Sequence, residues 1–147
     1  MYEYKCKVTR VVDGDTCDVV LDLGFSIEYR DRVRLMAIDT PESRTRNKVE
    51  KKLGLASKGR LKDLCQYYKG GLVLRTSKEG KGKFGRILGS LYPFGSEVSL
   101  NEMLIAEGHA RPYYGGSKSE VGEWTKQEDG QWYRWTKDGY VLIQEEK

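Results

Sequence analysis

The first third of the chain alternates apolar and polar residues, which is the period of half-buried β-strands. Residues 2–9 form the first such run, and the Asp-Gly-Asp turn at 13–15 separates it from the second. The second run is predicted to present one apolar face, made of Val19, Leu21, Leu23 and Phe25. A third strand is predicted from about Ile27 to Ile38, so the segment as a whole indicates a β-meander.

Two helices are predicted among the later strands. The first follows from an apolar stripe at helical spacing that consists of Ser57, Leu61, Leu64, Cys65 and Tyr68 and ends at Gly70-Gly71. The second begins with the capping-box pair Ser99 and Glu102 and ends at Gly108. Between the helices, residues 72–76 and 86–92 are typical of strands around a Lys- and Gly-rich loop.

Five strands with helices after the third and the fifth are the order expected of an OB-type barrel. We therefore expect a mainly β fold of the α+β class, in which a five-stranded OB-fold barrel packs against two helices. This domain is predicted to span residues 1–114. Its single core suits a chain of 147 residues.

Residues 115–147 differ in composition and contain all three tryptophans and two Asp-Gly turn signals. They predict a short C-terminal β-meander of two or three strands, which is docked on the barrel because so short a segment rarely folds alone. Two roles are possible for the tryptophans, namely Trp124, Trp132 and Trp135. They attach this appendage to the barrel, or they form a platform on which nucleic-acid bases stack.

Composition narrows the class of protein only slightly. The net charge of +4 and the pI of about 8.9 allow a polyanionic partner but do not require one. The three cysteines are odd in number and lack metal-ligand spacing, which indicates reduced, packed thiols. No segment resembles a membrane span or a secretory signal, so we expect a cytoplasmic monomer, secreted only if a leader has been removed.

Several acidic residues lie at predicted strand ends. Asp13 and Asp15 flank the first turn, and Asp39 ends the third strand just before Thr40 and Pro41. Carboxylates and an extended backbone carbonyl are the oxygen donors that a hard divalent cation prefers. The alternative is that Asp-Gly only makes a hairpin turn and Asp39 only caps a strand.

Three further charged residues could act on a phosphate. Arg34 and Arg86 could bind its oxygens bidentately, or they could form ordinary surface ion pairs. Glu42 could activate a water molecule, or it could simply lie at the surface. A cation, a carboxylate base and two arginines together would suffice to cleave a phosphodiester.

Five segments carry a resemblance to a known family: VVDGDT (11–16), RLMAIDTPE (34–42), VEKKLGLAS (49–57), GKFGR (82–86) and LNEMLIAEGHARPYY (100–114). In this order and spacing they resemble the staphylococcal nuclease (thermonuclease) family, over roughly residues 6–114. The resemblance implies an OB-fold, calcium-dependent endonuclease that cleaves DNA and RNA with little sequence specificity and leaves 3′-phosphate ends. The cofactor it implies is one Ca²⁺ ion, with other divalent ions as alternatives.

The resemblance also implies roles for individual residues. Asp15, Asp39 and the Thr40 carbonyl match the metal ligands, and Asp13 matches a supporting acidic position. Arg34 and Arg86 match the phosphate-binding arginines, and Glu42 matches the general base or a residue that orients the water. The expected substrate contacts are Lys83, Tyr113 and Tyr114, and the expected partner is single-stranded or frayed DNA or RNA.

The chain departs from the family pattern in three places, one of which is the composition of the loop ESRTRNKV (42–49). Phe84 replaces a tyrosine, which removes a hydroxyl contact to the nucleotide. Residues 115–147 do not resemble the family's third helix. The competing hypothesis is therefore a catalytically weak or inactive OB-fold module that binds nucleic acid. A barrel whose charges are only decorative would leave Arg34 and Glu42 unexplained.

Overall fold

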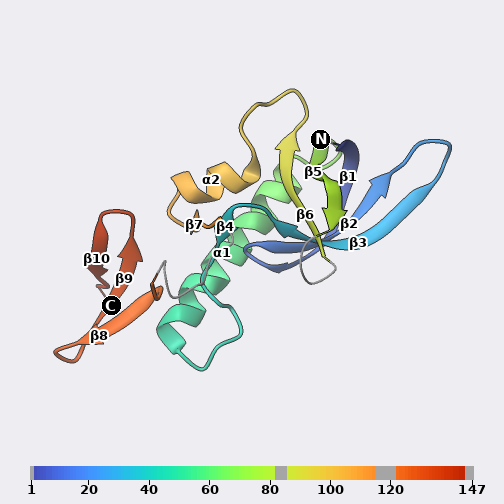
Figure 1. Ribbon diagram of the computed structural model, residues 1–147. Helices are drawn as coiled ribbons and strands as arrows, with labels where there is room; N and C mark the ends of the chain where they lie inside the picture. Colours follow the sequence, from blue (N-terminus) through green and yellow to red (C-terminus); the bar gives the residue numbers. More distant parts are fainter. Residues whose placement is uncertain (1, 82–85, 115–121, 145–147) are drawn as a thin grey trace.

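Five strands close into a β-barrel in the computed structural model, which describes residues 2–81, 86–114 and 122–144 (Figure 1). Around the barrel the strand order is β1-β2-β3-β6-β5, and β3 and β6 form its parallel pair. The strands are β1 (Tyr2–Asp13), β2 (Thr16–Asp22), β3 (Glu28–Leu35), β5 (Leu72–Lys81) and β6 (Ile87–Pro93). The expected α+β fold with an OB-type barrel is confirmed.

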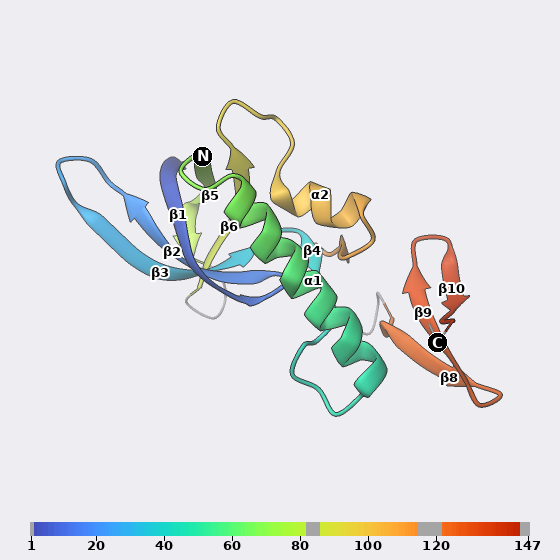
Figure 2. The same cartoon turned by 180° about the vertical axis from the view of Figure 1, so that it is seen from behind.

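The two helices lie where the sequence predicted them, after the third and fifth barrel strands. Helix α1 (Lys48–Tyr67) runs along the outside of the barrel, and α2 (Leu100–Ala106) lies beside it (Figure 2). Asn47 caps α1 by accepting hydrogen bonds from the amides of Val49 and Glu50. The predicted capping box of Ser99 and Glu102 is present at the start of α2.

The core lies inside the barrel and under the helices. Alternate barrel residues such as Val33 and Leu74 are fully buried, and so are Leu61 of α1 and Leu104 of α2. The three cysteines are reduced and buried, as expected, and burial raises the pKa of Cys6 and Cys65 to about 12. Neither helix in the described part of the chain could span a lipid bilayer.

Three of the predicted strand ends are wrong. Leu23, Phe25 and Ile27 are exposed at the tip of the β2–β3 hairpin, because Gly24, Phe25 and Ser26 adopt left-handed backbone conformations there. The predicted loop after residue 76 is also shorter than expected, since β5 continues to Lys81.

The third predicted strand does not run unbroken to Ile38. It ends at Leu35, and Ala37 adopts a positive φ of 64°. Beyond this turn the short strand β4 (Ile38–Asp39) pairs with β7 (Arg111–Pro112), outside the barrel. The break separates Asp39 from the barrel strand that carries Arg34.

Small residues on α1 let two other segments approach it closely. A Cβ atom on Gly54 would lie 2.7 Å from the Ser43 nitrogen and closer still to the Glu42 carbonyl oxygen. A Cβ atom on Gly14, in the β1–β2 turn, would lie 2.8 Å from the Ser57 Cβ and 3.1 Å from the Thr40 Cγ2. The turn at 13–15 and the loop at 40–43 therefore meet against one face of α1.

The C-terminal segment forms a three-stranded antiparallel sheet in the order β10-β9-β8. Its strands are β8 (Thr125–Glu128), β9 (Gln131–Thr136) and β10 (Gly139–Leu142), which confirms the predicted meander. The sheet touches the rest of the molecule through side chains. Asn47 donates to Thr125 Oγ1 at 3.0 Å, and Arg134 donates to the Gly108 carbonyl at 3.0 Å.

Because the Glu42–Ser43 backbone lies so close to Gly54, any side chain added there should lower the stability of the protein. We expect Gly54→Ala to lower the free energy of unfolding by about 1–3 kcal/mol, because the new methyl group must push the Glu42–Ser43 backbone away. Gly59→Ala is the matched control on the same helix, since nothing lies within 4 Å of its added Cβ. That change should stabilise the protein by up to about 1 kcal/mol. Urea unfolding measures both, and equal effects would show that the contact is not tight.

Candidate active site

A cleft of about 320 Å³ lies at the end of the barrel where the β1–β2 turn, β3 and the 40–43 loop meet. Most of the predicted site residues line it, although they come from distant parts of the chain. They are Asp13, Asp15, Arg34, Thr40, Glu42, Arg86 and Tyr113. Thr16 and Pro41 complete the lining.

Arg34 is held firmly in this cleft. Its guanidinium donates to the carbonyls of Leu35 and Ile38 at 2.8 and 2.9 Å, which ties it to the turn that ends β3. It also lies 3.4 Å from the Asp15 carboxylate, with both side chains 13% exposed. Arg34 therefore presents its charge to the cleft in a fixed orientation.

Asp15 is oriented by its neighbours as well. Its carboxylate accepts a hydrogen bond from Thr16 Oγ1 at 2.9 Å, and its carbonyl accepts one from the Leu35 amide at 2.7 Å. Thr16 pairs with Arg34 across the β2–β3 ladder, so the register of the barrel brings Asp15 and Arg34 together.

Asp13 holds the 40–43 loop in place. Ser43, which is buried, donates a hydrogen bond from Oγ to the Asp13 carboxylate. This contact fixes the loop that carries Thr40 and Glu42 against the β1–β2 turn. The supporting role of Asp13 beside a metal stays a prediction.

The other two charged residues of the cleft, Glu42 and Arg86, come from different parts of the fold. Glu42 is exposed on the loop before α1, and Arg86 directly precedes β6. Nearby Glu50 is partly buried, and its pKa is raised by this burial and then by the charges of Glu42 and Asp39. Glu50 thus lies near the carboxylates of Glu42 and Asp39 and near the Arg111 cation, which acts against them.

Asp39 is not among the residues that line the cleft. Its side chain is 3% exposed, and its Oδ2 accepts hydrogen bonds from the Arg111 guanidinium and from Trp124 Nε1, each at 3.1 Å. Arg111 in turn stacks on the Trp124 ring at 4.4 Å. Because Trp124 immediately precedes β8, this cluster fastens the C-terminal sheet next to the site.

The tryptophans therefore do not form a common exposed platform. Trp124 is buried and packs edge to face against Trp135, with their ring centroids 5.6 Å apart. Trp132 and Trp135 are each partly buried in β9. These contacts support the packing reading over the stacking reading.

Among the described residues, one expected substrate contact is not in the cleft lining. Tyr114 is 86% exposed and does not border the cleft, whereas Tyr113 does. Lys83 and Phe84 lie outside the described residues. Ser43 and Arg111 were not predicted from the sequence. Gly54, a glycine inside a helix, is a sequence signal of the close packing at Ser43, whereas no such signal marks Arg111.

Divalent-cation binding depends on which oxygens face the cleft. Asp15 and Thr40 line it together, and oxygen donors without His or Cys suit a hard cation. Within the described residues, no three His, Cys, Asp or Glu side chains cluster as metal ligands. The donor set therefore fits a cation held by few protein oxygens, with water and substrate supplying the rest. Asp39 as a ligand stays a prediction, because Arg111 and Trp124 already engage its Oδ2.

One family model and two relatives from Bacillus subtilis are similar to this chain. A family model described as staphylococcal nuclease homologue matches residues 32–129. The chain is 34% identical over 106 residues to endonuclease YncB of Bacillus subtilis (strain 168), covering 71% of the chain and 46% of that protein. It is 32% identical over 139 residues to the SPbeta prophage-derived endonuclease YokF of the same organism, covering 90% and 44%. The chain thus aligns with less than half the length of either relative.

The buried pair of Arg111 and Asp39 predicts a large loss of stability when one partner is removed. We expect Arg111→Met to lower the free energy of unfolding by about 3–5 kcal/mol, because the Asp39 charge stays buried. Arg60→Met is the matched control, since Arg60 pairs with Glu107 with both side chains 37% exposed. That change should cost far less than the loss of Arg111, because solvent screens an exposed ion pair. Similar losses in urea unfolding would contradict the account of a buried ion pair.

Proposed function

The chain belongs to the staphylococcal nuclease homologue family, and we propose that it is a metal-dependent endonuclease. Its substrate in this proposal is DNA or RNA, cleaved with little sequence specificity to leave 3′-phosphate ends. The observation that carries the proposal is the cleft in which Asp15, Arg34, Glu42 and Arg86 lie together. The names of the endonuclease relatives support the same activity.

Arg34 and Arg86 would bind the scissile phosphate. A guanidinium matches two phosphate oxygens and remains charged, so it can stabilise the extra negative charge of the transition state. Arg34 is suited to this because the Leu35 and Ile38 carbonyls already fix its orientation. Little reorganisation is then needed when the phosphate enters the cleft.

Glu42 would act on the attacking water molecule. Its carboxylate accepts a proton as the water oxygen bonds to phosphorus, or it orients the water for this attack. The bond between phosphorus and the 5′-oxygen breaks, and the departing oxygen takes a proton from solvent. The products are then a 3′-phosphate and a 5′-hydroxyl.

A Ca²⁺ ion would be held by Asp15 and the Thr40 carbonyl, with Asp39 as the further predicted ligand. When bound, such an ion polarises a phosphoryl oxygen and neutralises charge. Tyr113, at the cleft, would contact the nucleotide, which a single-stranded or frayed strand presents most readily. Lys83 and Tyr114 stay predicted substrate contacts.

Removal of divalent ions tests the cation directly. We expect a chelator to abolish cleavage of denatured DNA, because it removes the ion that Asp15 and Thr40 would hold. Added Ca²⁺ should restore cleavage. Ca²⁺ should also raise the melting temperature of the wild type but not of Asp15→Asn, which provides a readout besides cleavage. Cleavage that persists in chelator would contradict a metal-dependent mechanism.

Glu42 can be tested by an isosteric change. We expect Glu42→Gln to lower kcat by about 10²–10⁴-fold while KM changes little, because a neutral amide cannot accept the water proton. Glu97→Gln is the control, since Glu97 is exposed and lies outside the cleft lining. If kcat were unchanged in both variants, Glu42 would have no part in the chemistry.

A second candidate function is a module that binds nucleic acid and cleaves it weakly or not at all. The specific observation in its favour is that Asp39, a predicted metal ligand, pairs with Arg111 and Trp124. Under this alternative, the wild type would bind single-stranded DNA in both chelator and Ca²⁺ without cutting it.

A further inference from the structure

A second surface of the molecule concentrates positive charge along strand β1. Two adjoining hollows of about 630 and 810 Å³ lie there, and both are bordered by Cys6, Lys7 and Leu72. They continue from β1 toward α1 and toward the β2–β3 ribbon. We call this surface the basic groove and define it by its cationic residues: Lys5, Lys7, Arg10, Arg30, Lys58, Lys62 and Lys69.

The groove accounts for the positive charge of the whole chain. Its seven cationic side chains face only two acidic ones, Glu28 and Asp63, which gives a net charge of +5. The complete chain carries +4, so the remainder is slightly negative. One cation, Arg30, pairs with Glu28 at 3.6 Å, and both of these side chains are largely exposed. A surface this basic attracts a polyanion, whose phosphates replace condensed counterions.

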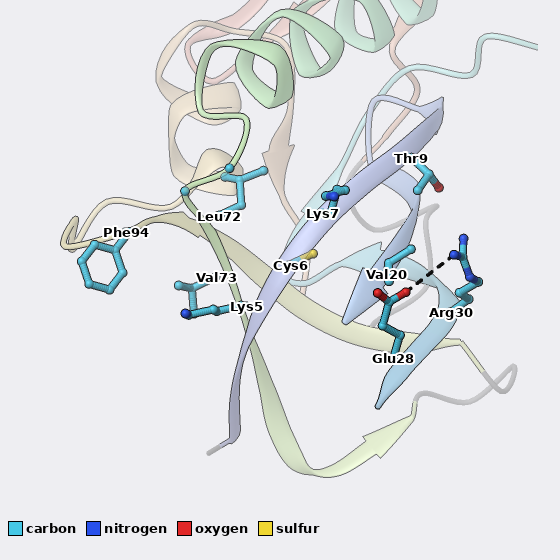
Figure 3. Close-up of a pocket in the computed structure, with 12 residues that line it drawn as sticks. Lys5, Cys6, Lys7, Thr9, Val20, Glu28, Arg30, Leu72, Val73 and Phe94 are labelled. Carbon is cyan, nitrogen blue, oxygen red and sulfur yellow. Dashed lines mark ion pairs between the residues drawn. The ribbon is translucent and has the colours of Figure 1, made fainter. Parts of the chain in front are cut away.

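An exposed aromatic ring borders the same groove. Phe94 follows β6 and is 81% exposed, although a phenylalanine usually lies inside a protein. Figure 3 shows Phe94 on one side of β1 and the Glu28–Arg30 pair on the other. Cations that follow a backbone, combined with a ring on which a base can stack, are the two elements of single-strand binding sites.

Strand β1 connects the basic groove with the candidate active site, since it carries residues of both. Strand β1 runs from Lys5 through Arg10 to Asp13, which lines the cleft. On α1, Lys58 follows Ser57, the residue against which Gly14 packs. From Lys5 to Arg10 the strand extends about 17 Å, enough to contact several phosphates.

We propose that the basic groove binds single-stranded nucleic acid outside the catalytic cleft, with Phe94 stacking on a base. This inference rests on the proposed function in one respect, namely that the bound strand continues into the cleft and is cleaved there. The groove raises the affinity for long strands, whereas the chemistry stays with the cleft.

The test compares two triple variants that lose the same charge. Lys7→Ala/Lys62→Ala/Lys69→Ala removes three of the seven cations of the groove, and Lys51→Ala/Lys52→Ala/Lys137→Ala removes three exposed lysines from outside it. Circular dichroism and melting temperatures verify that both fold. The binding of a long fluorescent single-stranded oligonucleotide is measured in chelator over a range of salt concentrations. Cleavage of an oligonucleotide of only a few nucleotides is measured in Ca²⁺.

We expect the groove variant to bind the long strand at least tenfold more weakly, with a salt slope shallower by about 2, as three lost phosphate contacts predict. The control variant should change the affinity less than threefold, and cleavage of the short substrate should be unchanged in both. Phe94→Ala should weaken binding of single strands about tenfold without changing the salt slope.

Two results would overturn the inference. One is a groove variant that binds the long strand as the control does. The other is a groove variant that keeps its nucleic-acid affinity but loses binding to phosphatidylserine vesicles, since this would assign the groove to a lipid surface. Failure of the proposed function would give a different result. The wild type would then bind the strand through the groove but would not cleave it.

Discussion

The candidate active site depends on one packing constraint. Two backbone segments contact the face of helix α1 that carries small residues. Gly54 leaves room for the Glu42–Ser43 backbone, and Ser57 leaves room for Gly14 in the β1–β2 turn. Ser57 also donates to the His109 carbonyl at 2.7 Å, which joins α1 to the segment after α2. The hydrogen bond from Ser43 to Asp13 then connects the two segments to each other. Because of these contacts, residues far apart in the chain border one cleft.

The C-terminal sheet is attached to the same region through charge as well as through apolar packing. Arg111 pairs with Asp39, stacks on Trp124 and donates to the Gly122 carbonyl at 2.8 Å. A buried charge pair is strongly sensitive to the loss of either partner, so the position of the sheet and the position of Asp39 depend on each other. This gives the appendage a structural role beside the cleft, through contacts with the β4–β7 pair, the start of α1 and the turn after α2.

Much of the fold and of the site could be predicted from local sequence. Strand alternation, the helical stripe on α1 and the capping box at Ser99 depend on neighbouring residues, and all of them are found. The ends of β2 and β3 could not be predicted, because Phe25, Ser26 and Ala37 adopt positive φ angles that residues other than glycine rarely take. The pairing of Asp39 with Arg111, 72 positions away, follows from the β4–β7 ladder, and no periodicity reveals such a contact.

In the proposed mechanism, a phosphodiester lies between Arg34 and Arg86 and is hydrolysed at its 5′-oxygen. Mass spectrometry of the fragments from a single-stranded oligonucleotide tests it most directly, with Arg34→Met and Arg86→Met beside the wild type. The account predicts 3′-phosphate and 5′-hydroxyl ends from the wild type and a loss of about 10²-fold or more in rate for each variant. Fragments with 5′-phosphate ends, or undiminished cleavage in both variants, would contradict it.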